Sequence, residues 1–234
     1  MAGEAQRRRL RALVKRCNAA IDPETIAQAF VHESASREGA GPSNERLEFL
    51  GDAIVGFIAS AWLYEHYAAE NEGALSRRKA ILVSDEAFAQ TAQRLEFGDL
   101  LVVGHGLDHG PGRANVSVLA GAFEAFVAAL HRAAGGDVAA RFVETEHLIP
   151  TDLSEADAFD AKTRLQELTQ ARFGLLPVYL ERAEGPAHDR RFTSRVTVKE
   201  EVLGEGIGSS KKTAQQNAAT MALAALRTRD PDAP

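Results

Sequence analysis

Three carboxylates recur along one predicted helix of this chain. Glu45, Glu48 and Asp52 are three and four residues apart, so at about 100° per residue they lie within roughly 60° of one another on the helix surface. Like charges at this spacing repel each other. Either water solvates this face, as on many surface helices, or a cation binds there, and carboxylate oxygens suit Mg²⁺ or Mn²⁺. The pattern alone leaves both interpretations open.

The same helix carries apolar side chains on the side away from the carboxylates. Those on the side opposite the carboxylates are Leu47, Leu50, Ile54, Phe57 and Ile58, and their spacing predicts that they form a buried face. Phe49 falls about 40° from Glu45 on the helical wheel, outside that face. An aromatic residue there needs a partner, which is either a loop of its own chain or a second subunit.

Composition restricts the class of protein. A chain of 234 residues with 45% hydrophobic content can bury a core and predicts two compact units. Its single cysteine, Cys17, excludes an internal disulfide and a multi-cysteine zinc site. Neither a leader pattern nor a run of 18 apolar residues is present, so we expect a cytoplasmic protein without membrane contact.

The periodicity of apolar residues changes along the chain. Up to Leu148 it is helical, and residues 149–160 are acidic and poor in apolar side chains, which indicates a linker. A helix over 161–172, three segments of alternating apolar and polar residues, and an alanine-rich helix over 214–226 follow. We therefore expect an all-α domain at 1–148 and an α+β domain, ordered α-β-β-β-α, at 161–228.

Charge is divided unequally between these two parts. Residues 161–234 hold 12 Lys and Arg against 9 Asp and Glu, whereas residues 1–160 hold 15 against 24. A metal-binding part and a phosphate-binding part would produce this division. Acidic surface charge that keeps the first domain soluble would explain it equally well.

Several motifs resemble those of known proteins. The segment 44–52, NERLEFLGD, resembles the signature of the ribonuclease III family, and segments 30–32, 72–76 and 115–125 agree with it. The segments 162–167, 185–188 and 206–214 resemble the double-stranded-RNA-binding domain. Together they cover nearly the whole chain in the order found in the bacterial enzyme.

This resemblance implies a Mg²⁺-dependent endoribonuclease, with Mn²⁺ as a possible substitute, that cuts duplex RNA to 5′-phosphate and 3′-hydroxyl ends. It implies ribosomal and messenger RNA precursors as substrates, a homodimer in which Phe49 packs into the neighbouring subunit, and no organic cofactor. Glu48, Asp52 and Glu124 fall on metal-ligand positions, and Asp52, Glu124 and Glu45 on positions that serve catalysis. Glu72 matches a further acidic position near the RNA.

The second domain supplies the expected contacts to the duplex. Lys211 and Lys212 lie at the start of the last helix, where the helix dipole and free amide groups attract phosphate. The resemblance adds four RNA-binding residues: Thr163, Gln166, Glu167 and His188.

One position departs from the family pattern. Gly121 stands three residues before Glu124, where the family has an aspartate that also binds the metal. Either water replaces this ligand and a weaker nuclease remains, or the chain is a non-cleaving regulator that binds duplex RNA. A helical metal-binding protein without an RNA role is a third possibility. Because the other acidic residues are present, we expect activity to be retained, and a weakened nuclease should gain activity at low Mg²⁺ from Gly121→Asp.

Overall fold

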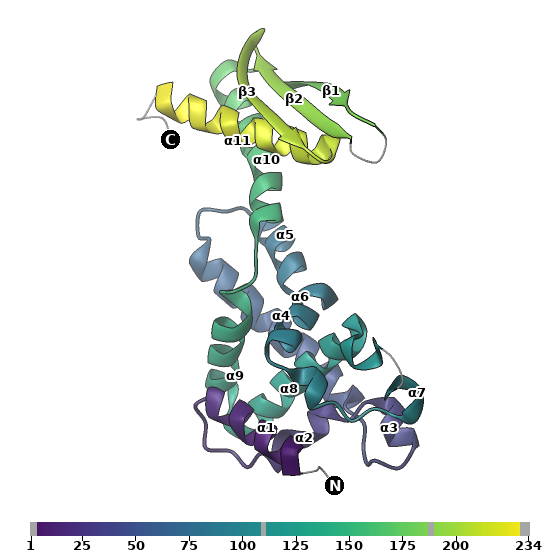
Figure 1. Cartoon of the computed structure of the whole chain (residues 1–234). Coiled ribbons are helices and arrows are strands. Elements are labelled where there is room, and N and C mark those ends of the chain that lie inside the picture. The colour runs from purple at the N-terminus through teal and green to yellow at the C-terminus, as the bar shows by residue number, and fades with distance from the viewer. Residues whose placement is uncertain (1–3, 109–110, 187–189, 230–234) are drawn as a thin grey trace. The chain divides into compact units, whose positions relative to one another are not determined.

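The computed structural model describes residues 4–108, 111–186 and 190–229 and divides the chain into two compact units, Met1–Thr151 and Asp152–Pro234 (Figure 1). Each unit is described by itself.

The first unit is helical, as predicted. Its α-helices and shorter helical turns are α1 (Glu4–Arg16), α2 (Glu24–Ala27), η1 (Gln28–Phe30), α3 (Glu33–Arg37), α4 (Glu45–His66), α5 (Glu72–Leu82), α6 (Asp85–Arg94), η2 (Phe97–Asp99), α7 (His105–Asp108), η3 (Pro111–Ala114), α8 (Val116–Ala134), α9 (Gly136–Val143) and η4 (Glu144–Leu148).

Helix α8 forms the centre of this unit. Most of its side chains are buried, and α4, α6 and α9 pack against it. Aromatic rings fill the space around it: Phe88 stacks on Phe123 with ring centroids 5.2 Å apart, and Phe126 lies 5.4 Å from Phe97. The start of α8 is fixed by Asn115, whose side chain accepts hydrogen bonds from the amides of the first helical turn.

The beginning of α4 is anchored inside the unit. Asn44 is buried and donates from Nδ2 to the carbonyl oxygen of Ala29 at 3.2 Å, while its backbone amide donates to Val31 at 2.8 Å. These bonds hold the first turn of α4, which carries Glu45 and Glu48, against the segment that follows η1.

The buried face of α4 differs from the prediction. It consists of Leu47, Gly51, Val55, Ala59 and Leu63, a row with four-residue spacing that includes two very small residues. Small residues let α8 approach closely, so the contact follows this row.

Two residues expected in the core are consequently outside it. Phe57 is 73% exposed and Leu50 is 36% exposed, so the prediction that these side chains are buried was wrong within the single chain.

Helices α4 and α8 are each long and apolar enough, by length and composition, to cross a membrane. Helices of a buried core meet the same criteria, and 61% of the apolar window of α8 is buried inside the unit.

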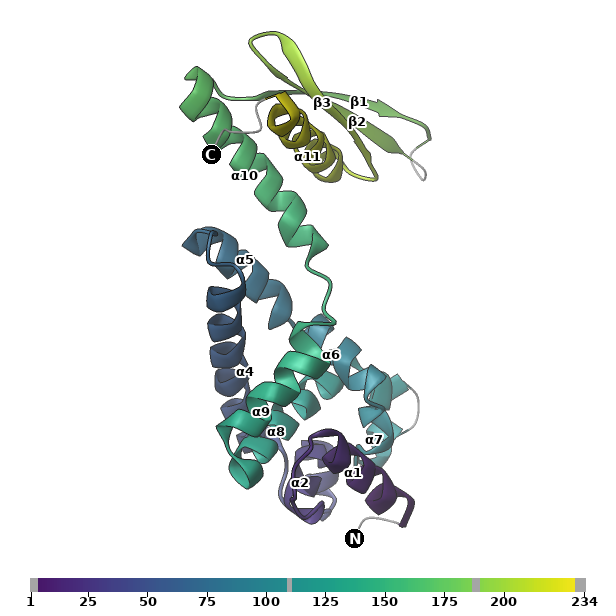
Figure 2. The same ribbon diagram turned by 90° about the vertical axis from the view of Figure 1, so that its left-hand side faces the viewer.

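The second unit has the predicted order α-β-β-β-α. It comprises α10 (Ser154–Phe173), β1 (Val178–Glu184), β2 (Arg191–Val198), β3 (Glu201–Gly208) and α11 (Lys211–Arg229). The strands form an antiparallel sheet in the order β1-β2-β3. Figure 2 shows α11 lying across one face of this sheet, and α10 packs against α11.

Helix α10 begins seven residues earlier than the predicted helix, inside the segment expected to be a linker. Asp152 explains this start, because its carboxylate accepts hydrogen bonds from the Ser154 amide at 2.9 Å and the Ser154 hydroxyl at 3.0 Å. The same bonds lower the pKa of Asp152. Residues 154–160, which were expected to belong to the linker, are therefore helical.

Candidate active site

Helices α4 and α8 are in close backbone contact at Gly51. A Cβ atom added there would lie 2.0 Å from the backbone carbonyl oxygen of Glu124 and 2.9 Å from its Cα. Only glycine permits this contact between backbones. Glu48 lies one turn before Gly51 and Asp52 directly after it, so the contact brings two carboxylates of α4 to the part of α8 that carries Glu124.

The Glu48 side chain lies against α8 as well. A Cβ atom added to Gly121 would lie 2.7 Å from Glu48 Oε2, 2.9 Å from Cδ and 3.3 Å from Oε1. Gly121 precedes Glu124 by about one helical turn. The carboxylate of Glu48 therefore covers the face of α8 that leads to Glu124.

Glu124 is half-buried, and its pKa is raised from 4.5 to about 8. Burial is the largest cause, followed by the charges of three acids, Glu48, Asp52 and Asp85. Burial and the charge of Glu45 also raise the pKa of Glu48, with His32 acting in the opposite direction. Glu124 and Glu48 are therefore each close enough to other acids predicted from the sequence for their negative charges to raise its pKa.

The chemistry of this donor set fits a divalent cation. Hard carboxylate oxygens are the ligands that Mg²⁺ and Mn²⁺ prefer, and a cation there would offset the negative charges of Glu48 and Asp52 that contribute to the raised pKa of Glu124. Within the described ranges, however, no group of three or more His, Cys, Asp or Glu side chains is arranged to hold an ion directly. An ion would have to draw these side chains closer together.

Asp85 is a member of this group that the sequence analysis missed. It is the exposed first residue of α6, where Ser84 caps the helix by accepting a hydrogen bond from the Ala87 amide at 3.2 Å. One turn later Phe88 stacks on Phe123, the neighbour of Glu124. An acid in the first turn of a helix is ordinary, so no sequence signal singles out Asp85.

Glu45 and Glu72, the two other acids predicted from the sequence, have different surroundings. Glu45 accepts a hydrogen bond from the Ser43 hydroxyl at 2.7 Å and raises the pKa of Glu48, which places it at the rim of the group. Glu72 begins α5 and accepts a hydrogen bond from the Ser76 hydroxyl at 2.7 Å. It is not among the groups that shift the pKa of Glu48 or Glu124.

Phe49 is 83% exposed, so it does not cover a loop of its own chain. Phe57 and Tyr64, which is 75% exposed, follow it on α4. At about 100° per residue the three aromatic rings lie within roughly 80° of one another. They form an exposed aromatic strip on a helix whose opposite face is buried.

In the second unit, Lys211 and Lys212 are the first residues of α11. The helix is capped at this point, since the Thr213 amide donates to Ser210 Oγ at 3.1 Å. Lys211 Nζ lies 3.5 Å from the Glu181 carboxylate on β1, and both side chains are accessible to solvent.

The remaining predicted RNA contacts lie on α10. Thr163 is half-buried, whereas Gln166 and Glu167 are exposed. Their spacing of three and four residues puts them on one face of the helix. His188 lies outside the described residues.

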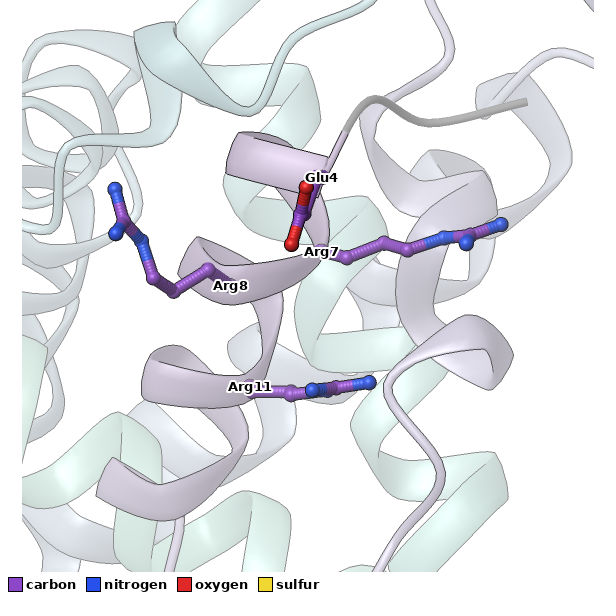
Figure 3. Close-up of a pocket in the computed structure, with 4 residues that line it drawn as sticks. All are labelled: Glu4, Arg7, Arg8 and Arg11. Atoms are coloured by element: carbon purple, nitrogen blue, oxygen red, sulfur yellow. The ribbon is translucent and has the colours of Figure 1, made fainter.

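A hollow of about 790 Å³ on α1 is lined by Glu4, Arg7, Arg8 and Arg11 (Figure 3). Figure 3 shows Arg7 and Arg8 pointing away from each other, and Arg7 forms an ion pair with Glu24 at 3.2 Å. The hollow gathers no nucleophile or carboxylate pair, and we regard it as a solvated face of α1.

The two units together define a helical nuclease-type domain followed by a double-stranded-RNA-binding fold. Residues 22–151 match the family model described as Ribonuclease-III-like, and residues 161–226 match the double-stranded RNA binding motif. The chain belongs to the ribonuclease III family and is a ribonuclease III-type endoribonuclease.

Relatives extend this similarity over most of the chain. It is 41% identical over 213 residues to Ribonuclease 3 of Geobacter sulfurreducens, covering 88% of this chain and 86% of the relative. It is 38% identical over 208 residues to Ribonuclease 3 of Desulfotalea psychrophila, covering 87% and 86%.

A solved structure agrees with the fold of the first unit. The nuclease domain of ribonuclease III from Campylobacter jejuni matches with a TM-score of 0.52 and 31% identity, covering 57% of this chain and 95% of that domain. That domain is structurally flexible in a region involved in its dimer formation.

Proposed function

We propose that this chain hydrolyses phosphodiester bonds in duplex RNA with Mg²⁺, or Mn²⁺ in its place, leaving 5′-phosphate and 3′-hydroxyl ends. Precursors of ribosomal and messenger RNA are the proposed substrates, and the cytoplasm is the proposed location. The observation that carries the proposal is the half-buried Glu124 carboxyl, which the contact at Gly51 sets beside Glu48 and Asp52 and whose pKa is about 8.

Glu48, Asp52 and Glu124 are the residues that would hold the ion. When bound, a divalent ion activates water and neutralises charge on the phosphate that is cut. Asp52 is exposed, so its carboxylate is open to solvent. With its pKa raised to about 8, Glu124 holds a proton near neutral pH, and a bound cation would favour release of that proton. Glu45 orients its carboxylate at the rim through Ser43.

The second unit would hold the duplex. Double-stranded RNA exposes phosphates and 2′-hydroxyl groups rather than readable base edges. Lys211 and Lys212 would bind phosphate at the start of α11. Thr163, Gln166 and Glu167 on α10, with His188, would contact the minor groove, and Glu72 in the first unit would contact the RNA near the cut.

The exposed aromatic strip on α4 supports a homodimer. Phe49, Phe57 and Tyr64 are largely exposed in the single chain, and contiguous apolar surface of this kind marks interaction sites. A second copy of the chain that covers the strip would bury Phe49 next to the carboxylates and bring two sites into one particle.

The proposal is tested with Glu124→Gln. This variant should lose cleavage of a labelled RNA duplex in Mg²⁺ while still shifting that duplex in a gel without metal. Glu65→Gln, which removes an exposed carboxylate from α4, is the matched control and should cut as the wild type does. Undiminished cleavage by Glu124→Gln would refute the assignment.

Gly121 favours one alternative, a duplex-RNA-binding regulator that does not cut. In that case the wild-type protein would shift duplex RNA with a steep dependence on salt. It would leave the RNA intact even in excess Mg²⁺ or Mn²⁺.

A further inference from the structure

Gly121 stands in the second turn of α8, and glycine inside a helix costs about 1 kcal/mol relative to alanine. Its φ is not in the positive range that favours glycine. Backbone conformation therefore does not require a glycine at this position, and its neighbouring atoms are the remaining explanation. The atoms that an added Cβ would meet are those of the Glu48 carboxyl group, with Oε2 at 2.7 Å and Cδ at 2.9 Å.

The other glycines of α4 and α8 have different surroundings. At Gly51 an added Cβ would meet the backbone of Glu124, and at Gly56 it would meet Lys79 Nζ at 3.9 Å, an ordinary contact. Of these three helical glycines, Gly121 is the one whose free space is filled by a carboxylate of the candidate active site.

We propose that Gly121 is a positioning residue for Glu48. Because position 121 has no side chain, the Glu48 carboxylate lies directly on α8, one turn from Glu124. A carboxylate from α4 thus takes the space in which a side chain of α8 would otherwise stand. This inference rests on the proposed function, since it concerns a carboxylate that would bind the ion.

The inference changes what is expected of Gly121→Asp. An aspartate at this position would need the space that the Glu48 carboxylate occupies and would add a like charge in contact with it. Gly121→Asp should therefore move Glu48 away from α8 while adding a carboxylate of its own, so this variant does not isolate the role of Glu48.

The decisive variant is Gly121→Ala, which adds a single carbon atom. The contact is with the far end of a flexible side chain, so Glu48 can move away and the protein should fold. We expect the dissociation constant for Mn²⁺, measured by titration calorimetry on the full chain without RNA, to rise at least about tenfold. Thermal unfolding in EDTA should not occur at a lower temperature than in the wild type.

Two comparisons make the test specific to Glu48. Gly56→Ala makes the same exchange on α4 without disturbing a carboxylate and should bind Mn²⁺ as the wild type does. In a Glu48→Gln background, Gly121→Ala should change the Mn²⁺ dissociation constant less than about twofold, because effects that act through one side chain are not additive.

Three results would overturn the inference: wild-type Mn²⁺ affinity in Gly121→Ala, a full additional loss in the Glu48→Gln background, or a Gly121→Ala chain that is unfolded in EDTA. Glu124→Gln separates this failure from that of the proposed function. If Glu124→Gln binds Mn²⁺ normally, the metal site itself is refuted. If it binds weakly and Gly121→Ala binds normally, only the role of Gly121 is refuted.

Discussion

The raised pKa of Glu124 predicts how the stability of the metal-free protein depends on pH. A carboxyl group whose pKa rises from 4.5 to about 8 on folding binds its proton more tightly in the folded state. Its contribution to stability is present in full below pH 4.5 and is lost as the pH rises through about 8. Glu124→Gln removes this titration and should make the unfolding free energy less dependent on pH.

The size of the effect follows from the same values. A tenfold change in proton affinity corresponds to about 1.4 kcal/mol, so the full shift would amount to about 5 kcal/mol in a site closed to solvent. Glu124 is only half-buried. Because water screens such a group, we expect about 2 kcal/mol between pH 5 and pH 9.

Urea unfolding in EDTA at pH 5 and pH 9 measures this difference. The wild type should lose about 2 kcal/mol more than Glu124→Gln between the two pH values. The comparison cancels the titrating groups outside the site, because both proteins contain them in the same surroundings. Glu65→Gln, at an exposed position on α4, should behave as the wild type does.

A second measurement uses the proton directly. At pH 7 Glu124 is mostly protonated, so Mg²⁺ binding should release close to one proton, seen by calorimetry in two buffers of different ionisation enthalpy. At pH 9 the release should vanish. Two results together would refute the conclusion that burial and neighbouring acids raise the pKa of Glu124. These are an equal pH dependence of stability in wild type and Glu124→Gln, and no proton release at pH 7.

Three further variants test other parts of the molecule. Lys211→Ala with Lys212→Ala should weaken duplex RNA binding and flatten the plot of log affinity against log salt by about 2, measured by fluorescence anisotropy; an unchanged slope would exclude these lysines as phosphate contacts. Phe49→Glu should turn a dimer into a monomer in sedimentation experiments, and an unchanged mass would move the interface elsewhere. Gly51→Ala should lower the unfolding free energy by about 1–3 kcal/mol relative to Gly56→Ala, because its Cβ would lie 2.0 Å from a backbone oxygen; equal stability of the two would contradict the close contact of α4 and α8.

Patterns local in the chain predicted the architecture correctly. Alternation of apolar and polar residues over 192–198 predicted β2, in which Ser194, Val196 and Val198 are buried. Helical spacing predicted the first unit, and the alanine-rich segment 214–226 predicted the body of α11. These features depend on neighbours a few residues away, so a single sequence contains the necessary information.

The carboxylates could be named from their motifs, but their relation to one another depends on contacts between distant segments. Gly51 and Gly121 are 70 residues apart, and both are explained by the same packing of α4 on α8. Asp85 joins the group through the packing of α6 on α8, where Phe88 stacks on Phe123. The start of α6 shows nothing unusual in its sequence.

The faces of α4 illustrate the same limit. Periodicity marks which residues of a helix are apolar, yet it does not say which of them its own chain will cover. Packing against α8 follows the row that includes Gly51 and Ala59, because backbones can approach there, and Phe49 and Phe57 remain exposed. Residue types therefore identify the chemistry available to this chain, while the close approach of two helices sets the distances, burial and proton affinities of the groups that would perform it.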